Sequence, residues 1–316
     1  MNKSLKIVFF GTPDFAVHIL QAILEQKFEV SAVVSAPDKS AGRGRKIHTP
    51  AVAKFAKAHN LALLQPEKLK SKEFLKALEE FQADVFVVVA FRKLPRAVWQ
   101  MPKKGTFNLH ASLLPDYRGA APINWAIING EKTTGVTTFF IDENIDTGQI
   151  ILQKKCAISP DETAGELHDK LMELGAETTV ETLQLVSKNG VNPAQQSKPK
   201  LNKDAPKLFK ENTKIQWQDS LESVFNFVRG LNPYPTAWTY FKNENEKKYV
   251  KIIKVQIQHT PHSHKIGDLF IENAKLGVGH RNGIIWVEEL QMEGKKQLKA
   301  QDFINGFGDL TSWRVD

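Results

Sequence analysis

Residues 84–90 (Asp-Val-Phe-Val-Val-Val-Ala) form a run in which every interior position is apolar. A strand without polar alternation is typical of a parallel sheet that helices cover on both faces. Residues 5–10 are a second, mainly apolar run in which Lys6 is the one charged residue, and segments 15–26, 51–59 and 71–81 carry the periodicity of helices. Because strands and helices alternate, we expect an α/β fold of the doubly wound, Rossmann-like type.

The chain has 316 residues, which is long enough for two domains with separate cores. From about residue 215 the pattern changes to short strands at near-regular spacing with glycine turns, which predicts a small β-barrel of the oligonucleotide-binding (OB) type. Residues 190–206 are rich in Asn, Pro, Gln and Lys and have no hydrophobic period. We therefore expect one domain over 1–189, a linker over 190–206 and a second domain over 207–316.

Several classes of protein are disfavoured by what the sequence contains. It has neither a G-x-G-x-x-G nor a G-x-x-x-x-G-K-[ST] motif, which argues against a nicotinamide cofactor or a nucleoside triphosphate. No apolar run is long enough to cross a bilayer, and the single cysteine fits a reduced, cytoplasmic setting. The net charge of +8 points weakly to a polyanionic partner, but the charge is spread over the whole chain.

A set of polar residues marks the candidate site. Asn108 and His110 alternate along the expected strand 106–110, so both side chains leave from one face. Asp146 follows another hydrophobic strand and precedes a Thr-Gly pair, so it lies at a turn that could fold back towards that face. An amide, an imidazole and a carboxylate suit a reaction that builds negative charge on a carbonyl oxygen and moves protons nearby. Alternatively, Asn108 and His110 could merely bond the backbone of a turn.

Two basic segments could contact an anionic partner. In the loop 36–46, two glycines lie between cations, so Arg43, Arg45 and Lys46 could close over an anionic substrate, or could simply form a solvated basic loop. The densest basic stretch runs from residue 198 to 214 and includes Lys207 and Lys210. Lysines in such a stretch are suited to phosphate contacts.

Six motifs together resemble the methionyl-tRNA formyltransferase family. The Asn/His/Asp set alone would indicate only the wider class of formyltetrahydrofolate-using transferases, whereas the Gly-rich basic loop and the carboxyl-terminal barrel narrow the likeness. The motifs occur in order through nearly the full length, at residues 10–16, 41–46, 108–115, 118–123, 146–148 and 232–238.

The resemblance implies formyl transfer from 10-formyltetrahydrofolate to the α-amine of methionyl initiator tRNA, for translation initiation, by a metal-independent and by default monomeric enzyme. It also implies a role for each group of residues, with Arg43 discriminating the initiator tRNA. The implied catalytic residues are Asn108, His110 and Asp146; the folate-binding residues are Ser112, Leu113, Leu114, Pro115, Phe91 and Leu94; the tRNA-binding residues are Arg43, Arg45, Lys46, Lys207 and Lys210.

One departure and three alternatives stay open. The family commonly has a glycine and one more residue where this chain has Phe91, Arg92 and Lys93, which leaves the wall of the folate pocket open to question. The alternatives are a formyltransferase acting on a small amine such as an amino-sugar nucleotide, an RNA-binding module without turnover, and an enzyme that hydrolyses formylfolate with water.

Overall fold

The computed structural model describes residues 5–41, 46–198, 203–307, 310 and 312–316. Two compact units interleave along the chain. The first takes the described residues up to Gly119, then Thr134–Cys156 and the described part of Asp169–Lys203. The second takes Ala120–Thr133, Ala157–His168 and the described residues from Asp204 onward. Two short internal segments thus group with the carboxyl-terminal residues, while the division of the sequence at 189 and 207 stays a prediction.

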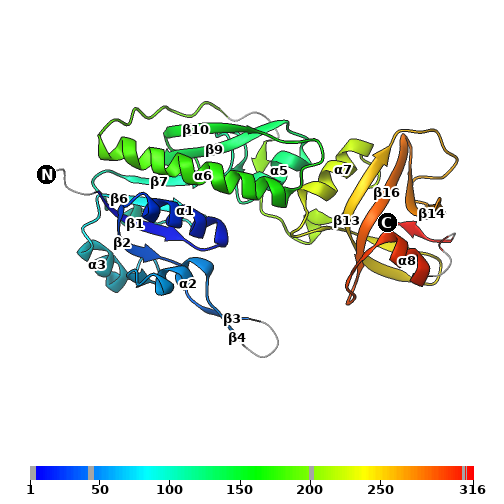
Figure 1. Ribbon diagram of the computed structural model, residues 1–316, viewed down its shortest axis with the longest axis horizontal. Helices are drawn as coiled ribbons and strands as arrows, with labels where there is room; N and C mark the ends of the chain where they lie inside the picture. Colours follow the sequence, from blue (N-terminus) through cyan, green and yellow to red (C-terminus); the bar gives the residue numbers. More distant parts are fainter. Residues whose placement is uncertain (1–4, 42–45, 199–202, 308–309, 311) are drawn as a thin grey trace. The chain divides into compact units, whose positions relative to one another are not determined.

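The first unit is built on a seven-stranded sheet with the order β10-β9-β7-β6-β1-β2-β5 (Figure 1). Strands β5, β2, β1, β6 and β7 run parallel, and β9 runs antiparallel to β7. This arrangement confirms the predicted α/β class. The strands are β1 Lys6–Gly11, β2 Glu29–Val34, β5 Leu63–Leu64, β6 Val85–Val89, β7 Thr106–His110, β9 Thr133–Phe140 and β10 Ile150–Ala157, followed by the short β8 Arg118–Gly119.

Helices cover both faces of this sheet. On one face Phe10 and Val88 pack with Phe74 and Leu78 of α3 in a buried cluster. On the other face, a Cβ placed on Gly175 of α6 would lie 2.8 Å from the side chain of Leu109, so α6 approaches the sheet closely there. The helices are α1 Asp14–Glu25, α2 Ala51–Ala58, α3 Lys72–Glu80, α4 Arg96–Trp99 and α6 Ala164–Ser187.

The basic loop over residues 36–46 is more regular than expected. Its ends pair as an antiparallel hairpin of β3 Lys39–Ala41 and β4 Lys46–His48. The sequence analysis treated 36–46 as a loop and did not predict this strand pairing. Arg43 and Arg45 lie outside the described residues, and Lys46 begins β4.

The second unit contains an antiparallel sheet with the order β14-β15-β16-β13-β12-β18, and β17 pairs with β16. The two edges of the sheet meet, because Asp268 bridges Arg314 and the Leu269 amide donates to the Trp313 carbonyl at 3.0 Å. This curled sheet confirms the predicted small OB-like domain (Figure 1). Its strands are β12 Ala237–Lys242, β13 Lys247–Gln258, β14 Leu269–Glu272, β15 Lys275–His280, β16 Gly283–Met292, β17 Gln297–Lys299 and β18 Arg314–Val315.

The helices of the second unit pack on this sheet and on one another. The Asn124 amide of α5 donates to the Gly230 carbonyl of α7 at 2.8 Å. In the part of the chain that the structure describes, no helix combines the length and the apolarity needed to span a bilayer. The helices are α5 Pro122–Ile128, η1 Glu211–Thr213, α7 Leu221–Gly230 and α8 Ala300–Phe307; the unit also includes the short strand β11 Asp204–Ala205.

Candidate active site

Asn108 and His110 lie at the carboxyl end of β7, on the same face as Val88 of the neighbouring strand β6. Parallel strands present their carboxyl ends along one edge of a sheet, where α/β proteins bind their ligands. The Asn108 side chain is half-buried and forms no hydrogen bond with any described residue. Its amide is therefore free to donate to a ligand.

Hydrogen bonding assigns distinct roles to the two nitrogens of His110. The Nε2 atom lies 2.8 Å from the Tyr117 carbonyl oxygen, and because a carbonyl can only accept, Nε2 must carry the proton of that bond. The Nδ1 atom lies 3.8 Å from Asp146 Oδ2. This separation is too long for a hydrogen bond but falls within the range of an ion pair. His110 thus does bond turn backbone, as the alternative interpretation held, but through one nitrogen only.

Asp146 is held by the backbone around it. Its φ angle is +55°, in the left-handed region that a turn after β9 requires. Its Oδ2 atom accepts a hydrogen bond of 3.0 Å from the Gly119 amide, and its side chain is only 14% exposed. The carboxylate therefore faces His110 rather than bulk solvent, which agrees with the expected fold-back of this turn.

Gln196 holds the same turn by hydrogen bonds. The sequence did not predict this residue. Its amide nitrogen donates to the carbonyls of Asp146 at 3.0 Å and Gly148 at 2.7 Å. Its amide oxygen accepts from Arg118 Nε at 3.2 Å and Nη2 at 2.5 Å. Gln196 belongs to the polar stretch assigned to a linker, and no motif there distinguishes it from its neighbours.

Close packing also explains the glycine that follows Asp146. A Cβ on Gly148 would lie 1.6 Å from the Phe140 carbonyl oxygen, so no side chain fits there. The Thr147 hydroxyl closes the turn by donating to Asp142 Oδ1 at 2.7 Å. The Thr-Gly pair thus has a structural reason to follow Asp146.

The loop after β7 carries four of the predicted folate-binding residues. The Thr137 hydroxyl donates to the Ser112 carbonyl at 2.7 Å and accepts from the Leu114 amide at 3.1 Å. Ser112 uses its own hydroxyl to donate to the Asp116 carbonyl, and Leu114 is 3% exposed. The side chains of Ser112 and Leu114 therefore support the loop, whereas Leu113 and Pro115 are half-buried at its surface.

The other two predicted folate-binding residues follow β6 at the same edge of the sheet. Phe91 is half-buried with its ring centroid 5.7 Å from that of Phe10, and Leu94 is buried in the same cluster. Arg92 turns to the segment after β5, where it donates to the carbonyls of Glu67, at 2.9 Å, and Pro66. Partial burial lowers the pKa of the Arg92 guanidinium from its ordinary value. Arg92, which lies where the chain departs from the family pattern, thus links the loop after β6 to the segment after β5.

The predicted tRNA-binding lysines of the second unit lie over aromatic rings. The Lys207 Nζ atom is 5.2 Å from the ring centroid of Phe209. The Lys210 Nζ atom is 5.6 Å from the Trp238 ring and 4.9 Å from the Tyr249 ring. Such cation–π contacts orient the amino groups without neutralising them.

Within the part of the chain that the structure describes, side chains that could ligate a metal do not gather into a group. Among the described residues, no three His, Cys, Asp or Glu side chains are placed to hold a metal ion together.

Comparison with known proteins defines the class to which this fold and site belong. Residues 5–183 match the family model described as formyl transferase, and residues 207–308 match the model described as formyl transferase, C-terminal domain. The first match covers the α/β sheet, and the second covers strands β12 to β17 of the curled antiparallel sheet. The class is that of the two-domain formyltransferases.

A relative then identifies the family. The chain is 49% identical to the methionyl-tRNA formyltransferase of Flavobacterium johnsoniae over 304 residues, which is 96% of each chain. With that identity and coverage, the chain belongs to the methionyl-tRNA formyltransferase family.

Solved structures show the same fold at lower identity. HypX from Aquifex aeolicus, in complex with tetrahydrofolic acid, is similar with a TM-score of 0.65 and 18% identity, over 95% of this chain and 47% of that one. An N-formyltransferase from Helicobacter canadensis, in complex with folinic acid and dTDP-3-aminofucose, is similar with a TM-score of 0.63 and 21% identity, over 91% of this chain and 99% of that one.

Proposed function

We propose that this chain transfers the formyl group of 10-formyltetrahydrofolate to the α-amino group of methionyl initiator tRNA, giving N-formylmethionyl-tRNA for translation initiation. The observation that carries the proposal is the pairing of His110 Nδ1 with Asp146 at the same edge of the sheet as Asn108, whose amide bonds no described residue. Family membership supports the same activity.

Each of the three predicted segments of the chain is assigned its own role. Residues 1–189 bind the folate and carry the chemistry, residues 190–206 connect, and residues 207–316 bind tRNA. Of the folate-binding residues, Leu113, Pro115 and Phe91 supply half-buried apolar surface, while Ser112, Leu114 and Leu94 fix the loops that present it. An apolar wall with few polar groups suits a flat heteroaromatic ring.

The formyl donor supplies the carbon that the methionyl amine attacks, and negative charge then develops on the formyl oxygen. Asn108 donates a hydrogen bond to that oxygen, where a preorganised donor stabilises the transition state more than the ground state. His110 can act only through Nδ1, because Nε2 is already bonded to the Tyr117 carbonyl. A protonated Nδ1 gives a second, charge-assisted bond to the same oxygen.

Asp146 orients His110 and carries the proton that the attacking amine loses. Its Oδ2 atom is fixed by the Gly119 amide, so the carboxylate stays 3.8 Å from Nδ1. The new carbon–nitrogen bond forms at the methionyl amine, the bond to the folate nitrogen breaks, and the proton moves from the first nitrogen to the second. Positioned acid–base groups typically accelerate such transfers by about a hundred- to ten-thousandfold.

Recognition of the tRNA is assigned to cations in two places. Lys207 and Lys210 supply phosphate contacts, which are tolerant of sequence and sensitive to salt. Arg43, Arg45 and Lys46 of the basic segment 36–46 are assigned to the acceptor end of the tRNA, with Arg43 discriminating the initiator.

One assay tests the proposal. Purified protein is incubated with labelled 10-formyltetrahydrofolate and with methionyl initiator tRNA, methionyl elongator tRNA or an amino-sugar nucleotide. We expect label only in the initiator tRNA. Label in the sugar, or release of formate without any acceptor, would show one of the alternative activities instead.

A further inference from the structure

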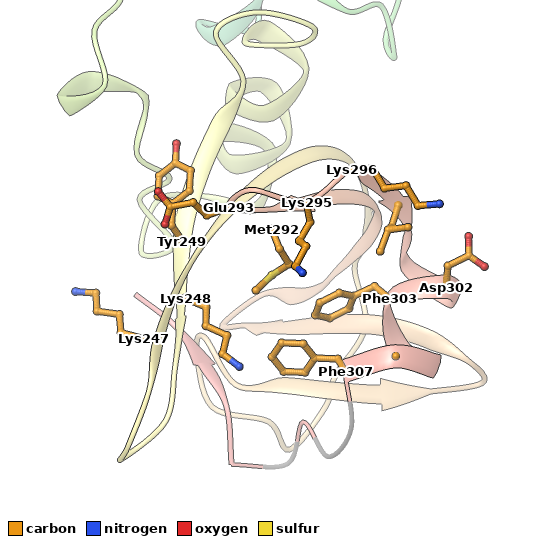
Figure 2. A pocket seen from close by; sticks show the side chains of 12 residues that line it. Lys247, Lys248, Tyr249, Met292, Glu293, Lys295, Lys296, Asp302, Phe303 and Phe307 are labelled. Carbon is orange, nitrogen blue, oxygen red and sulfur yellow. The ribbon is translucent and has the colours of Figure 1, made fainter. Parts of the chain in front are cut away.

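A hollow of about 610 Å³ opens in the second unit between the start of β13, the turn from β16 to β17, and α8. Figure 2 shows the side chains of Met292, Phe303 and Phe307 around this space. Leu298 completes the apolar lining. Phe303 is buried in the core behind it, whereas Phe307 and Met292 are half-buried and present surface to the hollow.

The rim of the hollow is positively charged. Four lysines and only two acidic residues line it, which leaves a formal charge of two positive units. Lys295 and Lys296 are exposed, and neither forms an ion pair within the described residues. Lys248 bonds Glu246 at 2.7 Å while its Nζ atom lies 5.0 Å from the Phe307 ring. An anionic occupant would meet complementary charge here.

A strip of aromatic and basic side chains lies on β12 and β13 next to the hollow, on the face of β13 opposite to Lys248. Tyr249 lines the hollow, and its ring centroid is 5.1 Å from that of Trp238. Lys210, one of the proposed tRNA contacts, lies over both rings. A lysine track beside a recess with an aromatic wall is the combination by which proteins bind single-stranded nucleic acid.

We propose that this hollow receives one unpaired nucleotide of the tRNA substrate. The base packs against Phe307 and Met292, and the adjoining phosphates lie by Lys295 and Lys296. The inference rests on the proposed function, because it deepens the recognition of the same tRNA. The volume is ample for a base and its sugar, and the rim charge matches a phosphodiester on either side.

Gly306 offers a way to fill the hollow without disturbing the fold. It lines the hollow on α8, and a Cβ placed on it would meet no atom within 4 Å. Gly306→Trp therefore puts a bulky ring into the space. Asn305→Trp is the matched control, since Asn305 is exposed on the same helix and does not line the hollow.

The experiment measures equilibrium binding of unacylated initiator tRNA to the full chain over a range of salt concentrations. Stacking of one base corresponds to an affinity change of about 5- to 150-fold, so we expect Gly306→Trp and Phe307→Ala to weaken binding by that factor with an unchanged salt slope. Asn305→Trp should bind as the parent does. Lys295→Ala should reduce the slope of log K against log salt by about 0.7 to 0.9.

Binding by both Gly306→Trp and Phe307→Ala within twofold of the parent would overturn the inference. Thermal denaturation checks that each variant is folded. If Gly306→Trp does not fold, Phe307→Ala alone decides the test. The formylation assay on the parent chain distinguishes a failure of the nucleotide site from a failure of the proposed function. If the parent formylates initiator tRNA while the variants bind it normally, only the nucleotide site fails; if the parent does not formylate it, the proposed function fails.

Discussion

At the scale of single residues, the chemistry depends on which atoms are left unbonded at the end of β7. The Asn108 amide bonds none of the residues that the structure describes, and His110 has only Nδ1 available beside Asp146. We expect Asn108→Ala and Asp146→Ala to lower the single-turnover rate of formyl transfer by about a hundred- to a thousandfold, since each removes a group that acts in the transition state. Both variants should unfold at nearly the parent temperature. Near-normal rates in both would refute the assignment.

Gln196 acts on the reaction through the turn that holds Asp146. Gln196→Ala removes two hydrogen bonds to that turn and two from Arg118, and each such bond contributes about 1 kcal/mol. We expect kcat to fall roughly tenfold with the KM for formylfolate little changed, because only the orientation of the carboxylate is affected. Gln195→Ala is the control, since Gln195 is the exposed neighbour. Equal kinetics for the two variants would exclude a positioning role.

The difference between Asn108 and Gln196 shows what the sequence could predict at this scale. Alternation along a strand places Asn108 and His110 on one face from the sequence alone. The Thr-Gly pair marks the turn of Asp146 because glycine is required there. Gln196 bonds backbone carbonyls some 50 positions away in the chain, and that contact leaves no local pattern.

At the scale of elements, strands and helices with strong periodicity were predictable and short pieces were not. The structure has β7 over the expected residues, and the Thr163–Glu166 capping box begins α6 with reciprocal bonds of 2.8 and 3.3 Å. The hairpin of β3 and β4 and the helix α8 were missed. Each of their segments spans only three to eight residues, so tertiary contacts rather than local pattern decide them.

The turn between β9 and β10 gives a prediction for an element. Gly148→Ala places a methyl group against the Phe140 carbonyl, so the two strand ends must separate. Overpacking of this kind typically lowers the free energy of unfolding by about 1–3 kcal/mol, and activity should fall as Asp146 shifts. Urea denaturation measures the change. Gly306→Ala is the control, because its methyl group enters open space and alanine favours a helix; equal stability of the two variants would contradict the packing argument.

At the scale of the whole molecule, the two substrates should respond to different parts of the chain. Arg43 is assigned to the tRNA acceptor end, so Arg43→Ala should lower kcat/KM for methionyl initiator tRNA. The KM for 10-formyltetrahydrofolate should stay unchanged, since the folate-binding residues follow other strands. Steady-state kinetics with each substrate varied in turn measures both. An equal loss for folate would show that the loop serves the folate pocket instead.

The salt dependence of affinity should also differ between the two substrates. A protein that neutralises tRNA phosphates releases counterions, so its affinity falls steeply as salt rises, whereas a small folate bound against apolar surface loses little. Replacing Lys210 should reduce the slope of log K against log salt for tRNA by about 0.7 to 0.9 and leave folate affinity as it was. The same substitution uncovers the Tyr249 ring, whereas Lys214 still lies 5.9 Å from the centroid of the Trp238 ring. Any gain in stacking on Tyr249 would appear as a higher affinity at high salt, where the phosphate contact contributes least. A parallel fall at all salt concentrations would instead mean that Lys210 holds the fold of the strip and contacts no phosphate.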